Sequence, residues 1–141
     1  MLKIALNLTL YILIAGRAFA MPGTCPFADD SKEEKLCISN EAGRTEKTMM
    51  AYLQAAQEAV SGDEALVQQI SDSQAAWLDY RKDQCDNGLL WAKLGGKPFS
   101  FRSSMECQLD LTRSRTRDIW AVYLSRTNAP PALSEPQFSR K

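Results

Sequence analysis

Apolar side chains recur every three to four residues along three stretches of this chain, which is the spacing of one face of an α-helix. The stretches run from about Ser39 to near Ser61, from the segment 61–64 to Cys85, and from about Ser100 or Phe101 to a point before Asn128. None of them alternates apolar and polar residues as a half-buried β-strand does. The pattern predicts an all-α protein, a small antiparallel bundle of three main helices.

Local signals indicate where these helices begin and end. Ser61 and Glu64 stand three residues apart before the second apolar run, the spacing of a capping box at a helix start. The sequence DNG at 86–88 is expected to end that helix, and GGKP at 95–98 is a second break. The segment 21–35 is rich in proline, glycine and charge, which predicts a loop.

The second helix has the most distinctive face. Its apolar stripe comprises Leu66, Ile70 and Trp77, broadened by Val67, Leu78 and Tyr80. Gln74 and Arg81 fall at the intervening turns of the same face, which ends at Cys85. This arrangement predicts a helix of about six turns with polar groups on its inner side.

Three arginines close together in the third helix do not form one basic cluster. Arg113 and Arg117 share a helix face, whereas Arg115 points roughly the other way. Arg115 lies close to the inward stripe, which includes Thr112, Thr116 and Ile119. We therefore expect Arg115 to be half-buried and hydrogen-bonded to the second helix, for example through Gln74, with a ligand contact as the alternative.

The first twenty residues have the layout of a secretory signal peptide. Lys3 precedes an apolar run that ends before Arg17, and the small residues at 18–20 suit cleavage after Ala20. The run is shorter than a typical membrane span, so no stable membrane insertion is expected after cleavage; an uncleaved anchor is the alternative. The predicted organisation is a signal peptide at 1–20, one helical domain at 21–126 and a flexible proline-rich tail at 127–141.

All four cysteines follow the cleavage point, and an even number in an exported chain predicts two disulfides. Three pairings are possible. We expect Cys25 with Cys37 and Cys85 with Cys107, because each pair brackets a short, turn-rich or loop segment that closes easily. A zinc site is the alternative, but the chain has no histidine and neither pair has the close spacing of zinc ligands.

Charge and residue types exclude several functions. Without the signal peptide the chain keeps 15 basic and 17 acidic side chains, a net charge of −2, which argues against a general nucleic-acid binder. The acidic residues lie on helical faces among lysines and arginines, and no serine elbow or phosphate-binding glycine loop is present. We therefore expect no catalytic residues, no metal site and no cofactor.

A short apolar insert lies between the second and third helices. Leu89, Leu90, Trp91 and Lys93 fall within it, and the segment is bracketed by Cys85 and Cys107. The insert either folds over the open end of the core or forms an exposed patch for a protein partner. A loop closed by a disulfide loses little entropy on binding, so these four residues are the candidate partner-contact loop.

Two segments carry a family resemblance. Gln74, Trp77, Arg81 and Cys85, followed by Cys107, Thr112, Arg115, Thr116 and Ile119, resemble the Q-x-x-W-x-x-x-R-x-x-x-C and C-x(4)-T-x-x-R-T-x-x-[LI] segments of the LprI-like lysozyme-inhibitor family. The first helix departs from that family, with Ala42, Glu46 and Leu53 at positions that usually hold leucine, aspartate and tyrosine. The resemblance implies a secreted, all-helical, disulfide-stapled domain, and inhibition of animal-type lysozyme for some members.

The expected function is that of a secreted or periplasmic, non-catalytic binding protein. Its protein partner would be lysozyme or another cell-wall hydrolase. The alternative is an envelope interaction or immunity protein that binds another secreted toxin or assembly. Because the shared motif residues fall on inward stripes, we expect them to form a structural network and not the inhibitory surface.

Overall fold

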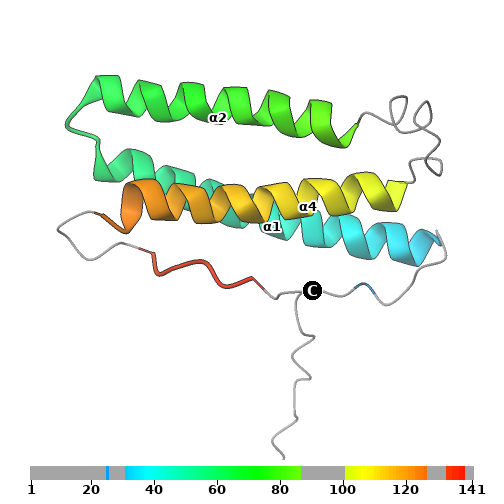
Figure 1. The fold of residues 1–141 in the computed structure, drawn as a ribbon. Coiled ribbons are helices and arrows are strands. Elements are labelled where there is room, and N and C mark those ends of the chain that lie inside the picture. The colour runs from blue at the N-terminus through cyan, green and yellow to red at the C-terminus, as the bar shows by residue number, and fades with distance from the viewer. Residues whose placement is uncertain (1–24, 26–30, 87–100, 127–132, 139–141) are drawn as a thin grey trace, which may run out of the picture.

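Three long helices form the protein in a computed structural model, which describes residues 25, 31–86, 101–126 and 133–138. They are α1 (Lys32–Ala59), α2 (Glu64–Cys85) and α4 (Phe101–Ile119), and α4 continues into a π-helical turn, η1 (Trp120–Leu124). Figure 1 shows α2 running antiparallel to α1, and α4 returning parallel to α1. The predicted all-α bundle of three main helices is confirmed. The predicted signal peptide lies outside the described residues.

Helix α1 begins earlier than the sequence pattern suggested. It starts at Lys32, so the expected loop over 21–35 is wrong for its last four residues. The Ser31 side chain accepts a hydrogen bond from the Glu34 backbone N–H (3.1 Å), and Glu33 and Glu34 lie at the positive end of the helix dipole. Ser31 and Glu34 have the spacing of a capping box, so a signal for this start was present in the sequence.

The N-cap of α2, by contrast, lies later in the chain than expected. Asp63, and not Ser61, is the N-cap residue, and its Oδ1 accepts hydrogen bonds from the backbone N–H groups of Ala65 (3.0 Å) and Leu66 (3.2 Å). A carboxylate at this position satisfies two free N–H groups and also interacts favourably with the helix dipole, which a serine hydroxyl does more weakly. The helix ends at Cys85, as the sequence predicted.

The core lies mainly between α1, α4 and η1. Its fully buried side chains include Met49 and Ala56 of α1, Ile119 of α4 and Leu124 of η1. From α2, Ile70 belongs to this cluster. Helix α1 contributes most of this cluster, whereas the buried residues of α4 besides Ile119 are Leu109 and the polar Thr112, Arg113 and Thr116.

Several residues expected on the stripe of α2 are exposed. Leu66, Leu78 and Tyr80 are 43%, 39% and 52% accessible to solvent. Only Ile70, Gln74 and Cys85 are buried among the 22 residues of this helix. The buried line is narrow because α2 meets the other helices along one ridge, so positions turned away from that ridge face solvent even when they are apolar.

Part of the C-terminal segment, for which the sequence predicted a flexible tail, packs against the helices. The Tyr52 hydroxyl donates to the Ser134 carbonyl (2.7 Å), and Trp120 Nε1–H donates to the Leu133 carbonyl (3.2 Å). Pro136 is buried, and Arg117 lies 5.2 Å from the centre of the Phe138 ring. Residues 133–138 therefore run along the bundle as a strap (Figure 1).

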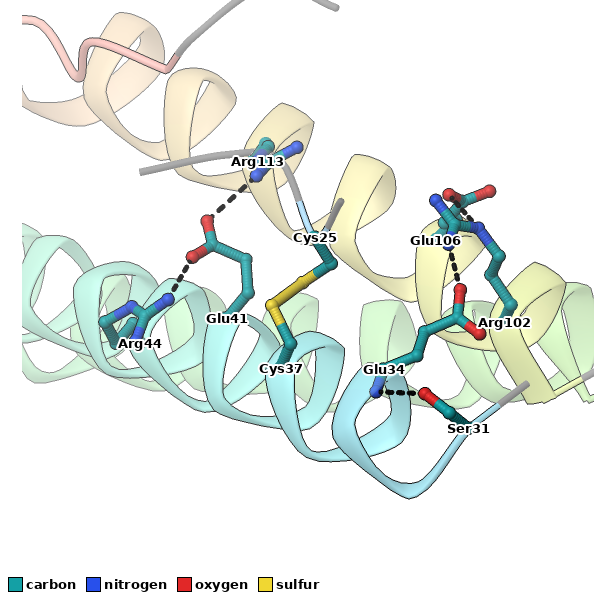
Figure 2. The surroundings of a disulfide bond; sticks show 9 residues. All are labelled: Cys25, Ser31, Glu34, Cys37, Glu41, Arg44, Arg102, Glu106 and Arg113. Carbon is teal, nitrogen blue, oxygen red and sulfur yellow. Dashed lines mark hydrogen bonds and ion pairs between the residues drawn. A yellow bond between two sulfur atoms is a disulfide. The ribbon is translucent and has the colours of Figure 1, made fainter. Parts of the chain in front are cut away.

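Both predicted disulfides are confirmed. Cys25 pairs with Cys37, with Cα atoms 5.8 Å apart, and Cys85 pairs with Cys107, with Cα atoms 5.6 Å apart. The first bond, in Figure 2, ties the chain before α1 to its second turn. The second joins the end of α2 to α4. Each closes a short loop and stabilises the fold by roughly 3 kcal/mol through the unfolded state.

Among the helices of the described residues, none combines the length and the apolar character that crossing a membrane requires.

Candidate functional site

Some of the residues that carry the sequence motifs form a network that joins all three helices. Arg81 of α2 forms an ion pair with Glu46 of α1 and donates a hydrogen bond to Thr112 Oγ1 of α4 (2.9 Å). The Thr112 hydroxyl in turn donates to the Gln108 carbonyl one turn earlier (2.7 Å). The Arg81 side chain is 17% exposed and that of Glu46 is 39% exposed, so water screens this ion pair only in part.

A second contact joins α4 to α2. Arg115 donates from Nε to Gln74 Oε1 (3.1 Å) and from Nη2 to Ser73 Oγ (3.0 Å). This is the contact between the two helices that the sequence suggested for Arg115. The buried Gln74 side chain also points its Nε2 at Met49 Sδ of α1 (3.7 Å), a weak hydrogen bond.

Trp77 lies beside both arginines of this network. The guanidinium carbon of Arg81 is 4.9 Å from the Trp77 ring centre, and that of Arg115 is 6.0 Å away. Both distances suit cation–π attraction. Thr116 and Ile119 are fully buried next to these groups on α4, and the Thr116 hydroxyl donates to the Thr112 carbonyl (2.7 Å).

Two further ion-pair groups hold α1 to α4, and sequence reasoning missed both (Figure 2). Glu41 accepts from Arg113 (3.0 Å) and from Arg44 (2.6 Å). Near the start of each helix, Arg102 pairs with the buried Glu34 and with Glu106 (3.0 Å). The hydrogen bond with Glu34 is the main cause that raises the pKa of Arg102 above its ordinary value.

Arg113 and Arg117 differ in burial, although the sequence placed them on one face of the third helix. Arg113 is 8% exposed, whereas Arg117, on the same predicted face, is exposed. The helix turns one side to α1 and the adjacent side to α2, so Arg113 is buried against α1 while Arg115 reaches α2. The pattern of a single helix cannot show that two of its sides have partners.

The candidate partner-contact loop, which comprises Leu89, Leu90, Trp91 and Lys93, lies outside the described residues.

An open hollow lies at the turn between α1 and α2, and it is lined by Gln54, Gln57, Glu58, Ser61, Glu64, Val67 and Gln68. Within the described ranges, no group of three or more histidine, cysteine or acidic side chains is placed to hold a metal ion.

The arrangement defines a small, disulfide-stapled helical protein in which the motif side chains bind one another. A family model described as lysozyme inhibitor LprI matches residues 25–119, and the chain belongs to this family. Neither the curated proteins nor the solved structures gave a match.

Two positions of the first helix that depart from the resembled pattern take part in the fold of this chain. The Glu46 carboxylate binds Arg81. Leu53 is buried, as is Tyr52 next to it in the chain. Glu46 therefore belongs to the three-helix network.

Proposed function

We propose that this protein is a secreted or periplasmic binding protein that inhibits a lysozyme-type peptidoglycan hydrolase and catalyses no reaction itself. Membership of the LprI lysozyme-inhibitor family is the observation that carries the proposal. The two disulfides support the compartment, because such bonds form and persist in oxidising surroundings, where cell-wall hydrolases also act.

The motif residues serve in this proposal as the scaffold. Arg81, Arg115 and Gln74 use their polar groups on partners within the three helices. The carboxylates of the buried Glu34 and the partly buried Glu41 likewise face arginines. Binding would then use an outer surface that the network and the disulfides hold in one shape, which lowers the entropy lost on association.

A titration tests the proposal. The oxidised mature chain, residues 21–141, is added to cell walls that are being digested by lysozymes of several types. We expect digestion by at least one type to slow in a dose-dependent manner at micromolar concentrations or below. The matched control is the same protein reduced and alkylated, which lacks the staples and should inhibit weakly. If no lysozyme type is slowed by the oxidised protein, the proposal is wrong.

A further inference from the structure

Helix α2 leaves one side without a partner among the described residues. Ala76, Asp79, Tyr80 and Asp83 are all exposed there, and their spacing of three, four and seven residues places them on one face. We name these four residues the α2 outer face. It points away from the ridge of Ile70, Gln74 and Cys85 that contacts the other helices.

The two aspartates of this face disfavour the helix that carries them. Asp79 and Asp83 are four residues apart, where like charges repel, and Asp83 lies in the last turn, where the helix dipole is negative. Aspartate also has a low intrinsic preference for helix interiors. No described residue forms an ion pair or a hydrogen bond with either side chain, although Lys82 lies between them.

Several other carboxylates in the described helices have partners, and Glu33 and Glu64 lie in first turns that favour negative charge, whereas Asp118 shares with this pair the lack of a described partner. Asp63 caps α2, Asp72 accepts from Gln68 (2.8 Å), and Glu41 and Glu46 bind arginines. Residues that destabilise their own helix and have no compensating contact are typical of functional surfaces. The cost at Asp79 and Asp83 therefore points to a use outside the chain.

Tyr80 adds a second, independent property of a binding surface. It is 52% exposed beside the two aspartates, and its ring offers a large apolar area with a polar hydroxyl at the end. Tyrosine is enriched at the centres of protein interfaces and loses little conformational entropy on binding.

The face is also held rigidly. Arg81, between the two aspartates in the chain, turns inward to Glu46 and Thr112, and the Cys85–Cys107 disulfide follows two residues after Asp83. A surface fixed before binding loses less entropy when a partner docks.

We propose that the α2 outer face docks onto a basic surface beside the substrate cleft of the hydrolase that this protein inhibits. The inference rests on the proposed function. Peptidoglycan carries carboxylates, so an enzyme that cleaves it gains from positive potential around its cleft, and Asp79 and Asp83 complement that potential. Tyr80 supplies the apolar anchor between the two charges.

Binding of an animal-type lysozyme to the oxidised mature protein and its variants, measured by calorimetry, tests the surface. The Asp79→Asn/Asp83→Asn double variant should bind at least about tenfold more weakly, and Tyr80→Ala should lose a similar factor. Raising the salt from about 50 mM to about 300 mM should weaken the wild type more than the double variant. The thermal midpoint of the double variant should be unchanged or higher, which separates lost binding from misfolding.

Matched controls make the test specific to this face. The Glu33→Gln/Asp118→Asn variant changes the net charge equally at exposed positions on other helices, and Leu78→Ala truncates an exposed apolar residue on another side of α2. Both should bind within about threefold of the wild type.

The outcomes distinguish this inference from the proposed function. If the wild type binds and the double variant binds equally well, the surface is wrong and the function stands. The surface is likewise wrong if Trp91→Ala abolishes binding while the double variant retains it. If the wild type neither binds nor inhibits any lysozyme type, both proposals are wrong.

Discussion

Arg81 is the residue on which the three helices converge. Its backbone belongs to α2, and its guanidinium contacts Glu46 of α1, Thr112 of α4 and the ring of Trp77. Removing the side chain would leave those partners without their common donor, and a half-buried carboxylate without its cation.

Arg81→Ala should therefore lower the free energy of unfolding by about 2–3 kcal/mol, less than for a fully buried pair because Glu46 is partly exposed. The neighbouring Lys82 forms no ion pair among the described residues, so Lys82→Ala should change stability by less than about 0.5 kcal/mol. Urea unfolding of the oxidised proteins provides both values. Equal effects of the two variants would show that the network does not hold the helices.

Tyr52 makes the stability of the folded protein depend on pH in the alkaline range. Burial raises its pKa above the ordinary value of 10.0, because the folded state disfavours the phenolate, and its hydroxyl donates to Ser134. A raised pKa means that the contribution is complete below about pH 10 and is lost as the pH rises towards the folded-state value.

Tyr52→Phe should cost about 1 kcal/mol at neutral pH through the lost hydrogen bond, and it should show a weaker loss of stability above about pH 10 than the wild type. Thermal midpoints of both proteins, measured from pH 7 to about pH 11, provide the comparison. The other tyrosines are common to both proteins, so parallel curves would contradict the role given to Tyr52.

At the scale of the elements, the start of α2 has two candidate N-cap residues, Ser61 and Asp63, and mutation distinguishes them. Asp63→Ala should destabilise the protein by about 1 kcal/mol, because two backbone N–H groups lose their acceptor. Ser61→Ala, two residues earlier, should have little effect. Urea unfolding measures the difference, and the opposite ranking would restore the capping box that the sequence alone suggested.

The sequence predicts the helices well because the three- to four-residue spacing of apolar positions reports one packed side directly. The sequence predicts the first residue of each helix less well, because two candidate N-cap residues can lie close together. At α1, Ser31 and Glu34 had the capping spacing, but the proline- and glycine-rich surroundings indicated a loop. Such choices depend on which side chain actually reaches a free N–H, and pattern alone does not decide that.

The contacts between elements are harder to predict for a different reason. Arg115 could be matched with Gln74 because both stand on inward stripes, whereas Arg113 could not be placed because α4 packs on two helices at once. The strap at 133–138 is held through the Leu133 and Ser134 carbonyls, and backbone acceptors leave no signature in the sequence. Leu78 and Tyr80 were expected on the inner stripe of α2 but are exposed, because apolar character alone does not require burial.

At the scale of the whole molecule, the second disulfide and the three-helix network join the helices to one another, and they make no contact with the α2 outer face among the described residues. The motif residues are thus the most recognisable part of the chain and, under the proposed function, the part that does not touch the hydrolase. Family membership supports an inhibitor, and under the proposed function the network lowers the entropy lost when the hydrolase binds.

Inhibition itself is best tested by the steady-state rate of cell-wall cleavage by an animal-type lysozyme at increasing concentrations of the oxidised mature protein. We predict saturable inhibition with one protein bound per enzyme, which persists on long incubation and is weakened at least about tenfold by Asp79→Asn/Asp83→Asn. Undiminished cleavage at every protein concentration, with this lysozyme and with the other lysozyme types, would contradict the proposed function.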